Sequence, residues 1–595
     1  MADKSFADQY ALPTFRQTRR RFRPSISTIL LLCLASLCSV VVYQTHFPPA
    51  SGLGSADVHA VCSAQGADIY TVDSHNSKVQ CIAIQNSFVA ATGSIEYIKS
   101  KWPSIHIKYI PKGMIVVPGI SESHCHIMGY GLYRQIPLET GKTVEQTVSY
   151  VRDYILNNPD ILNNPDTVVQ GWGWDHTAWP GGHFPSAADL DADPVIKGRL
   201  VMLRSKDGHG TWISGRVLDN LKDLPETIEG GSIIRDKDGK PAGVFLDNGQ
   251  SLLPVIKPTQ EDFERFFLAT AKDAHANGLT SLHDAKLDFD MLAYFKRKAE
   301  NGLPIRLYGF TNYDDGEEYW GNLTKPILLN KDHRFSARSV KLVGDGSMRS
   351  GSAYLYEPYS DDNTTSGFMR VSEKTLNRVI PWFLRDGWQV NVHAIGDRAN
   401  GIVLDSLESA FDGADVAALR PRLEHAQIMR EEDMKRVGKI GVIASVQPTH
   451  VIDDMWYAEE RIGPERVKGL YAFRSLLDNG ARITLGSDFP VETMNPIAGF
   501  YAAITRLSVD GRSPHGPGGW FPEQRLTRLE ALRGMTIDPA YASFTESVLG
   551  SLEPNKRADF VVLSQDIMEV PVKSLMATKV VATVMDGEVV FGNID

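Results

Sequence analysis

Short apolar strands alternate with helical stretches through the middle of the chain, and this rhythm restricts the possible folds more than any other feature. The expected helices lie at 261–277, 291–301, 374–385, 401–411, 431–439 and 467–479, and the expected strands at 115–117, 279–283, 305–310, 340–343, 389–393, 422–425, 442–446 and 483–485. Strands separated by helices pair in parallel, and eight such units can close into a barrel. The sequence therefore predicts an α/β fold, a (β/α)8 TIM-type barrel over residues 115–545, with its chemistry at the C-terminal ends of the strands.

Both ends of the chain carry a second kind of pattern. Short alternating runs at 67–73, 79–85 and 88–93 are typical of β-strands, and similar runs occur at 559–563, 580–585 and 588–591. Asp586-Gly587 is a hairpin turn sequence. Neither group is large enough to be stable alone. We therefore expect residues 57–114 and 546–595 to pair into one small β-sandwich beside the barrel.

A long insertion, about residues 143–258, separates the first two expected barrel strands. Connections of this length in a folded domain are usually functional or form a subdomain, so we expect a cap over the barrel mouth. The insertion contains Trp172, Trp174 and Trp179, and also His209. These residues are candidates for the substrate pocket, and the alternative for the tryptophans is the core of the cap.

The N-terminus combines a basic tail with an apolar segment. Five arginines lie between residues 16 and 23, and residues 26–43 contain no charge. A helix of about 20 apolar residues crosses a bilayer, and preceding arginines favour a cytoplasmic N-terminus. We expect a basic cytoplasmic tail at 1–25, a transmembrane signal anchor at 26–43 and a linker at 44–56, and hence a single-pass membrane protein with a luminal or extracellular catalytic domain. A cleaved signal peptide and a buried core helix are the alternatives.

Other features bear on export and on partners. Cys62 and Cys81 could form a disulfide in an oxidising compartment, and Asn322 and Asn363 begin glycosylation sequons that suggest a glycoprotein. An apolar content of 43% and a charged content of 23% are typical of a folded globular protein. The net charge of −10 argues against a general nucleic-acid binder. The expected partners are a small-molecule substrate and the membrane, and a homo-oligomer is left open.

Residues that could bind a metal follow several of the expected strands. His124 and His126 are separated by one residue, so in an extended chain they point to the same side. Lys341, His393, His425 and Asp488 follow the fourth, fifth, sixth and eighth expected strands. Taken singly, each histidine could be structural, the lysine could pair with Asp345, and the aspartate could cap a helix. Together they converge on the mouth of a closed barrel, where they suit one or two divalent metals, with zinc as the expected ion.

The motifs around these residues resemble those of the amidohydrolase superfamily, in particular its amidohydrolase 3 branch with YtcJ-like proteins and N-substituted formamide deformylase. The motifs are V-V-P-G-I-S-E-S-H-C-H at 116–126, G-L-T-S-L-H-D-A at 278–285, V-K-L-V-G-D-G-S at 340–347, H-A-I-G-D-R-A at 393–399, G-S-D-F-P-V at 486–491 and L-E-P-N-K-R-A-D-F-V-V-L at 552–563. The resemblance covers about residues 67–592. Glu122 stands where the first motif of the family usually has Asp.

The resemblance implies specific roles for the matching residues. His124, His126 and Asp488 would bind one metal, His393 and His425 would bind a second, and a carbamylated Lys341 would bridge the two. Asp488 would accept a proton from a metal-activated water and pass it to the leaving group. The implied reaction is hydrolysis of a non-peptide C–N bond in an amide, formamide or cyclic amide. A one-metal site is a variant of the same scheme, and Asp345 and Arg349 could face the substrate.

Two other functions stay open from the sequence. The same site could hydrolyse an ester, a lactone or a phosphoester, because fold and ligands alone do not select the electrophile. A non-catalytic, membrane-anchored binding glycoprotein is the second alternative. It fits less well, because all six ligand positions are filled.

Overall fold

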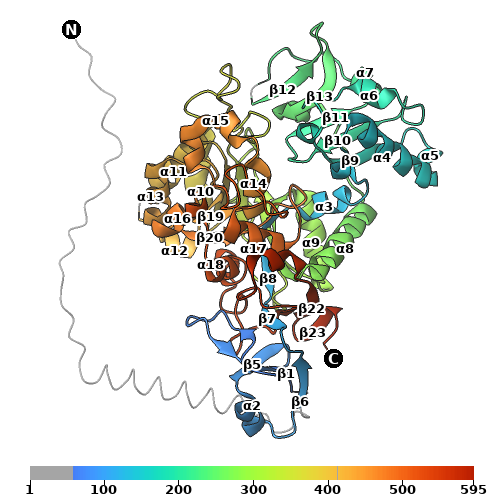
Figure 1. Cartoon of the computed structure of the whole chain (residues 1–595). Coiled ribbons are helices and arrows are strands. Elements are labelled where there is room, and N and C mark those ends of the chain that lie inside the picture. The colour runs from blue at the N-terminus through green and yellow to red at the C-terminus, as the bar shows by residue number, and fades with distance from the viewer. Residues whose placement is uncertain (1–57, 229, 412, 595) are drawn as a thin grey trace, which may run out of the picture. The chain divides into compact units, whose positions relative to one another are not determined.

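The structure is a computed structural model that describes residues 58–594 with the exception of 229 and 412 (Figure 1). The predicted cytoplasmic tail, signal anchor and linker at 1–56 lie outside the described residues. Among the helices that the structure does describe, none combines the length and the apolar character needed to cross a membrane.

The central domain is an eight-stranded parallel barrel. Its strands are β8 (Ile120–Cys125), β14 (Leu279–Leu287), β15 (Arg306–Asn312), β16 (Phe335–Val343), β17 (Gln389–Ala394), β18 (Arg422–His425), β19 (Ile443–Val446) and β20 (Arg482–Leu485). They are hydrogen-bonded in chain order, and every pair is parallel. Nearly all of their residues are buried, as expected for strands covered on both faces. The predicted α/β barrel is confirmed.

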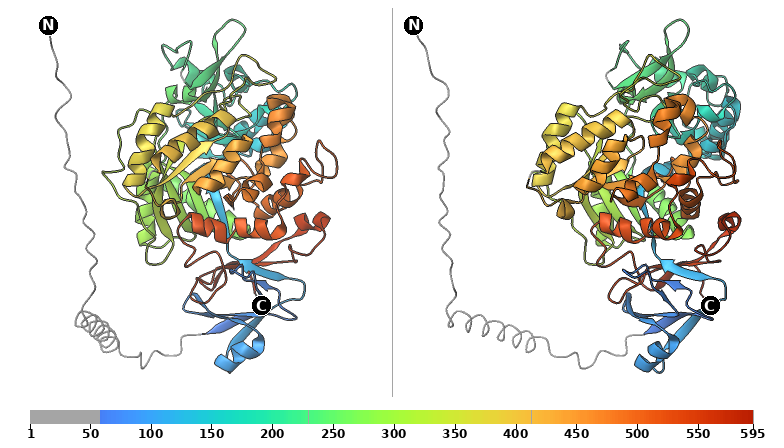
Figure 2. Two further views of the ribbon diagram at one scale, coloured as in Figure 1. Left: turned by 90° about the vertical axis from the view of Figure 1, so that its left-hand side faces the viewer. Right: turned by 60° about the vertical axis from the view of Figure 1, so that its left-hand side comes forward.

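Helices surround these strands (Figure 2). Those after successive strands include α3 (Ile127–Tyr133), α8 (Gln260–Ala276), α9 (Phe289–Glu300), α10 (Glu373–Arg385), α11 (Asp397–Ala410), α12 (Val416–Leu419), α13 (Glu431–Ile440), α14 (Pro448–Asp454), α15 (Ala458–Arg466), α16 (Phe473–Asp478), α17 (Pro496–Thr505), α18 (Arg528–Gly534) and α19 (Ile537–Ala542). Helix α8 illustrates how the sequence sets their limits. Thr259 and Asp262 form a reciprocal capping box at its start, and the helix then buries Phe263, Phe266 and Phe267.

One strand assignment from the sequence is wrong. Residues 115–117, predicted as the first barrel strand, form β7 (Ile115–Pro118), which pairs with β21 (Phe560–Leu563) outside the barrel. The first barrel strand is β8, immediately after Gly119. The physical reason is that a Cβ on Gly119 would lie 2.3 Å from the Thr280 hydroxyl oxygen, so only glycine lets the chain pass from one sheet into the next at this point.

The two chain ends pair into a small β-domain, at the end of the barrel opposite the insertion (Figures 1 and 2). One sheet has the order β5-β4-β1-β6 and the other β23-β22-β21-β7-β2-β3. Their strands are β1 (His59–Ser63), β2 (Ile69–Tyr70), β3 (Lys78–Val79), β4 (Cys81–Gln85), β5 (Phe88–Gly93), β6 (His106–Ile110), β22 (Val580–Met585) and β23 (Glu588–Gly592), with helix α2 (Ile95–Lys101) after β5. Cys62 and Cys81 are directly paired residues of β1 and β4 and form the predicted disulfide.

The insertion after α3 forms a cap with its own sheet, ordered β12-β13-β11-β10-β9. Its elements are α4 (Val144–Asn157), α5 (Pro159–Leu162), β9 (Val169–Trp174), α6 (Ala187–Asp191), β10 (Val201–Ser205), β11 (Gly210–Ile213), α7 (Gly215–Asp219), β12 (Gly231–Arg235) and β13 (Pro241–Asp247). Trp174, Trp179 and Trp212 pack together in its separate apolar core. The insertion is thus a subdomain rather than an extended loop.

A buried ion pair fastens the barrel to the β-domain. Arg306 of β15 is 2% exposed. Its Nε lies 2.6 Å and its Nη2 2.7 Å from the two carboxylate oxygens of Asp559, and Nη2 also lies 2.7 Å from Oδ1 of Asp586. A bidentate pair of this kind fixes orientation as well as distance. It therefore sets how β15 meets the C-terminal strands.

We expect Arg306→Ala to lower the free energy of unfolding by about 3–5 kcal/mol, because it leaves Asp559 buried without its counter-charge. The measurement is a urea-unfolding midpoint on the full chain. Lys435→Ala is the matched control, since Lys435 forms an exposed helical pair with Glu431 that should contribute under about 1 kcal/mol. Equal losses in the two variants would contradict this role for Arg306.

Candidate metal centre and active-site cavity

The predicted metal ligands meet at the C-terminal end of the barrel. The ring centres of His124 and His425 are 4.7 Å apart, and those of His393 and His425 are 4.5 Å apart. Nε2 of His126 lies 3.1 Å from Oδ1 of Asp488. One nitrogen of His124, one of His425 and one oxygen of Asp488 all lie within 4.8 Å of one another. Together with Lys341 they line one cavity of about 960 Å³.

Each of three histidines has one ring nitrogen held by an acceptor. His124 Nδ1 lies 2.6 Å from Oε2 of Glu424, and His425 Nδ1 lies 2.9 Å from Oε1 of Gln447. His393 Nε2 lies 3.2 Å from the carbonyl oxygen of Gly346. A nitrogen that donates its proton to such an acceptor leaves the lone pair on the other nitrogen. These contacts therefore hold three imidazoles in the orientation that a metal ligand would need.

Burial keeps these imidazoles neutral. It lowers the pKa of His124 to about 4 and lowers the pKa values of His393 and His425 well below the usual range. Burial alone would raise the pKa of Asp488, but its attraction to His124 and its contact with His126 outweigh that effect and hold the pKa below its usual range. The site thus offers neutral nitrogens and an ionised carboxylate, which is the donor set a zinc-like cation requires.

Asp488 itself has the features of a ligand without its ion. Its Oδ1 is buried and lies 3.1 Å from Nε2 of His126, but it accepts no hydrogen bond of standard geometry from any described residue. Its backbone has φ of 61°, a left-handed conformation that is uncommon outside glycine. A buried carboxylate oxygen without a donor is costly, and a cation would satisfy it. The residues present therefore fit a metal.

Lys341 lies beside this group and is 3% exposed. Its ammonium group makes no hydrogen bond or ion pair with the described residues. Burial lowers its pKa to about 8, although Glu424 and Asp488 act in the opposite direction. The alternative partner that the sequence suggested, Asp345, is engaged elsewhere: it accepts hydrogen bonds from the backbone N–H groups of Tyr354, Ile395 and Gly396 at 2.8–3.0 Å.

Glu122 joins the first and last barrel strands. Its carboxylate accepts hydrogen bonds from the N–H of His124 at 3.1 Å, from the N–H of Ser487 at 2.8 Å and from the Ser487 hydroxyl at 2.7 Å. Burial raises its pKa to about 8, and these three hydrogen bonds oppose that shift. Glu122 is therefore not among the predicted ligands. It holds the backbone at His124 on the first barrel strand and at Ser487, next to Asp488, after the last.

The residues predicted to face the substrate, among them Trp174, His209, Asp345 and Arg349, fall in different places. His209 lines the cavity, with its Nδ1 2.6 Å from Oδ1 of Asp247; burial would lower its pKa, but that carboxylate outweighs burial and raises it. Trp174 is fully buried in the cap core and does not line the main cavity, whereas Trp172 does. Asp345 lies behind His393, 3.4 Å from its Nε2.

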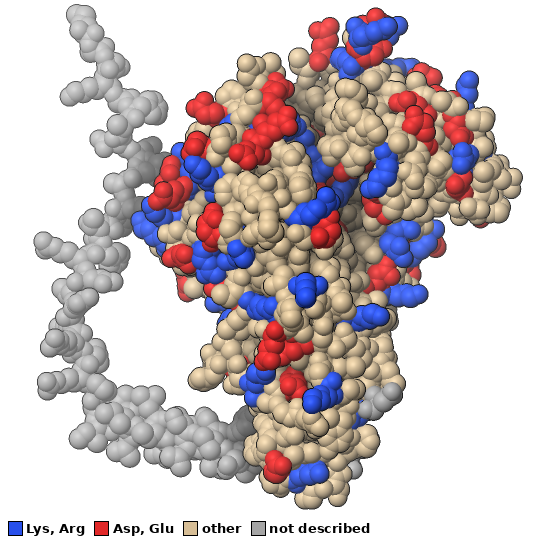
Figure 3. Space-filling model, in the orientation of Figure 1, with Lys and Arg blue, Asp and Glu red and all other residues tan. Residues whose placement is uncertain are grey.

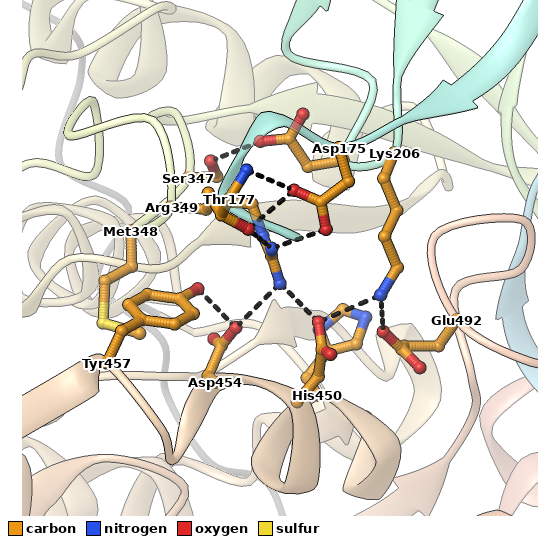
Figure 4. Close-up of polar contacts among 12 residues, drawn as sticks. Asp175, Thr177, Lys206, Ser347, Met348, Arg349, His450, Asp454, Tyr457 and Glu492 are labelled. Atoms are coloured by element: carbon orange, nitrogen blue, oxygen red, sulfur yellow. Dashed lines mark hydrogen bonds and ion pairs between the residues drawn. The ribbon is translucent and has the colours of Figure 1, made fainter. Parts of the chain in front are cut away.

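Arg349, the fourth of these residues, lines the cavity but is held in a charged network between cap and barrel (Figure 4). Its Nη1 lies 3.0 Å from Oδ2 of Asp175 in the cap, and its Nη2 pairs with Asp453 of α14. From the cap side, Lys206 lies 3.0 Å from Asp453 and 2.7 Å from Glu492. These ion pairs bind the cap to the barrel mouth. Figure 3 shows the cleft between the two parts, with charges of both signs around it.

A buried parallel barrel with a histidine–carboxylate centre at its C-terminal mouth defines a metal-dependent hydrolase. Residues 112–591 match the model of the Amidohydrolase family. The chain belongs to this family, and the resemblance stated from the motifs is confirmed.

Known relatives cover nearly the whole described chain. The chain is 31% identical to Protein LONG AFTER FAR-RED 3 of Arabidopsis thaliana over 87% of its length and 90% of the relative. It is 28% identical to the putative amidohydrolase YtcJ of Bacillus subtilis (strain 168), over 88% and 98%. It is 24% identical to N-substituted formamide deformylase of Arthrobacter pascens, over 88% and 96%.

A solved structure shows the same fold. The crystal structure of an uncharacterized metal-dependent hydrolase from Pyrococcus horikoshii OT3 superposes with a TM-score of 0.68 at 24% identity, covering 87% of this chain and 99% of that chain. The architecture of this chain is therefore a known fold.

Three polar residues of the site were not identified from the sequence. Glu424 and Gln447 hold the histidine ligands, and His450 lies with its Nε2 3.9 Å from Oδ2 of Asp488. Glu424 had one available signal, because it directly precedes His425 at the end of a predicted strand. Gln447 and His450 follow the seventh strand, at whose end no ligand was predicted.

We expect Glu424→Gln to weaken zinc affinity by about 10–100-fold, because the Nδ1–H of His124 loses its charged acceptor. Competition against a chromophoric chelator measures the affinity. Glu460→Gln, a change at an exposed glutamate of α15, is the matched control. Unchanged affinity in a folded Glu424→Gln protein would contradict the assigned role.

Proposed function

We propose that this protein hydrolyses a non-peptide C–N bond in an amide, formamide or cyclic amide, with one or two divalent cations, expected to be zinc. The observation that carries the proposal is the buried cluster of His124, His425 and Asp488, whose potential ligand atoms lie within 4.8 Å of one another, with the His393 ring 4.5 Å from that of His425. The similarity to N-substituted formamide deformylase supports the choice of a C–N bond. Catalysis at this site fits the position of the centre at the barrel mouth.

The chain's own residues would share the work as follows. His124, His126, His393, His425 and Asp488 would hold the cations, and Lys341, carbamylated, would bridge two of them. A divalent cation bound there would lower the pKa of a water molecule and polarise the substrate carbonyl. The acceptors on one ring nitrogen of His124, His393 and His425 would hold these rings in one orientation, so that they need not move during the reaction.

Asp488 would move the proton. An amine is a poor leaving group unless its nitrogen is protonated, so hydrolysis of a C–N bond needs a group that takes a proton from water and returns it to nitrogen. Asp488 is ionised and lines the cavity, and its Oδ2 faces His450 at 3.9 Å. His209, held at Nδ1 by Asp247, would donate a hydrogen bond from Nε2 to the substrate.

The test uses zinc-loaded full-length protein with N-formyl and N-acyl amines beside matched esters. We expect hydrolysis of C–N substrates and a loss of about a hundredfold or more in kcat for Asp488→Asn. Asp362→Asn, a change at an exposed loop aspartate, is the control. Faster turnover of esters by the same site would move the assignment to the esterase alternative. Failure to bind metal or to hydrolyse any substrate would favour a binding scaffold.

The bridging role of Lys341 makes a separate, pH-dependent prediction. Carbamylation consumes the neutral amine, and with a pKa of about 8 the neutral fraction grows as pH rises through that value. We expect bicarbonate to raise metal content and activity more at about pH 8.5 than at about pH 6.5. Lys341→Ala should abolish this response and reduce metal content. The same bicarbonate response in Lys341→Ala would contradict a carbamylated lysine.

A further inference from the structure

Besides Lys341 of the candidate metal centre, three cations in the cavity wall have no close carboxylate partner among the described residues. They are Arg204 on cap strand β10, Lys286 near the end of barrel strand β14, and Arg370 in the segment between β16 and α10. All three line the cavity that holds the candidate metal centre. Arg204 and Lys286 are exposed residues although the cavity encloses them. Their charges therefore face cavity space.

The contacts of each side chain leave its charge uncompensated. Within the described residues, the guanidinium of Arg204 makes no hydrogen bond or ion pair, and it lies 5.3 Å from the ring centre of Trp172. The Lys286 ammonium likewise has none among the residues described. The one ion pair of Arg370 within the described chain is 3.9 Å long, to an Asp247 oxygen that already faces His209 at 2.6 Å.

Other cations that line this cavity or, like Lys206, lie beside it are paired. They are Lys206 with Glu492 at 2.7 Å, Arg349 with Asp175 at 3.0 Å, Arg265 with Asp262 at 2.6 Å and Lys257 with Asp290 at 3.5 Å. The paired cations fasten segments of the protein to one another, as Figure 4 shows for Lys206 and Arg349. Apart from Lys341 in the candidate metal centre, the cations that line this cavity without a close carboxylate partner among the described residues are therefore Arg204, Lys286 and Arg370.

Arg370 and Arg204 lie close enough to Lys286 to repel its charge. Burial lowers the pKa of Lys286. The carboxylate of Asp314 opposes this shift, and the positive charges of Arg370 and Arg204 add to it. Asp314 is itself hydrogen-bonded to the Asn312 amide at 2.8 Å. Like charges that lie close together without a counter-ion are mutually destabilising. An anion that entered between them would remove that repulsion.

We propose that Arg204, Lys286 and Arg370 bind an oxyanion on the substrate, so that the preferred substrate is an amide carrying a carboxylate or phosphate. The identity of the bond cleaved rests on the proposed function, whereas anion binding does not. Guanidinium groups bind carboxylates and phosphates with two parallel hydrogen bonds. The face of Trp172 beside Arg204 offers apolar contact to the part of the substrate between the anion and the amide.

The first test measures binding without turnover. Titration calorimetry on the zinc-loaded full chain compares 4-acetylbenzoate and 4-acetylphenylphosphonate with neutral 4-acetylbenzyl alcohol, none of which has an amide, ester or phosphoester bond to cleave. We expect an anion to bind at least about tenfold more tightly than the neutral alcohol, as charge-assisted hydrogen bonds predict. The tighter of the two anions distinguishes a carboxylate from a phosphate substrate.

Variants show where the anion binds. Arg204→Gln, Lys286→Met and Arg370→Gln should each lower the anion affinity by about tenfold and leave binding of the neutral alcohol unchanged. Arg265→Gln is the control, because Arg265 lines the same cavity but is paired with Asp262. No preference for either anion would overturn the proposal. A preference that survives in the triple variant would overturn it too, since the anion would then bind the metal centre itself.

Hydrolysis of 4-formamidobenzoate and 4-formamidobenzamide separates this inference from the proposed function. We expect a lower KM for the acid, and loss of that advantage in the three variants. Equal hydrolysis of both compounds, unaffected by the variants, would contradict the anion site and support the proposed hydrolase function. Preferential binding of the anionic ligands without hydrolysis of either formamide would keep the anion site and count against the proposed reaction.

Discussion

The seam between the first and last barrel strands is the constraint on which the centre depends. Glu122 bonds to the backbone of His124 on one strand and of Ser487 beyond the other. The N–H of Asp488 also donates to the carbonyl oxygen of His124 at 2.8 Å. These bonds place two ligands from positions far apart in the chain side by side. They also hold Asp488 in a left-handed backbone conformation that would be unfavourable without such support.

Most of the fold could be predicted because its strands are short, apolar and separated by regular helices. The first strand could not, for a physical reason. Residues 115–117 are apolar and fully buried in the β-domain, and nothing local separates this environment from a barrel interior. The true strand β8 is polar in sequence, yet all of it is buried, because Glu122 and His124 find partners on other strands. Partners so far away in the sequence cannot be recognised from the residue pattern around 120–125.

The residues that line the centre could be predicted to lie together because they combine a residue type with a strand end, and the family motif joins them. The orienting residues depend on tertiary contacts that no spacing encodes. The two cap tryptophans show the same limit. Trp172 and Trp174 should share one face of a strand, but the pairing register with β10 shifts between Arg204 and Ser205, and Gly173 has φ of 124°. Trp172 therefore faces the cavity, while Trp174 enters the cap core.

The charged side chains of this protein fall into two groups: those paired within the chain and those left without a partner among the described residues. Where Arg306 joins two domains and where Lys206 joins cap to barrel, every charge has a close partner, and the contacts are complete within the chain. At the centre, Lys341 and one oxygen of Asp488 stay unsatisfied by the described residues. Unsatisfied buried groups lower stability, and natural structures retain them chiefly where a ligand completes them. The incomplete contacts therefore indicate where a metal would bind, and by the same reasoning the unpaired cations in the cavity wall indicate where an anionic group of the substrate would bind.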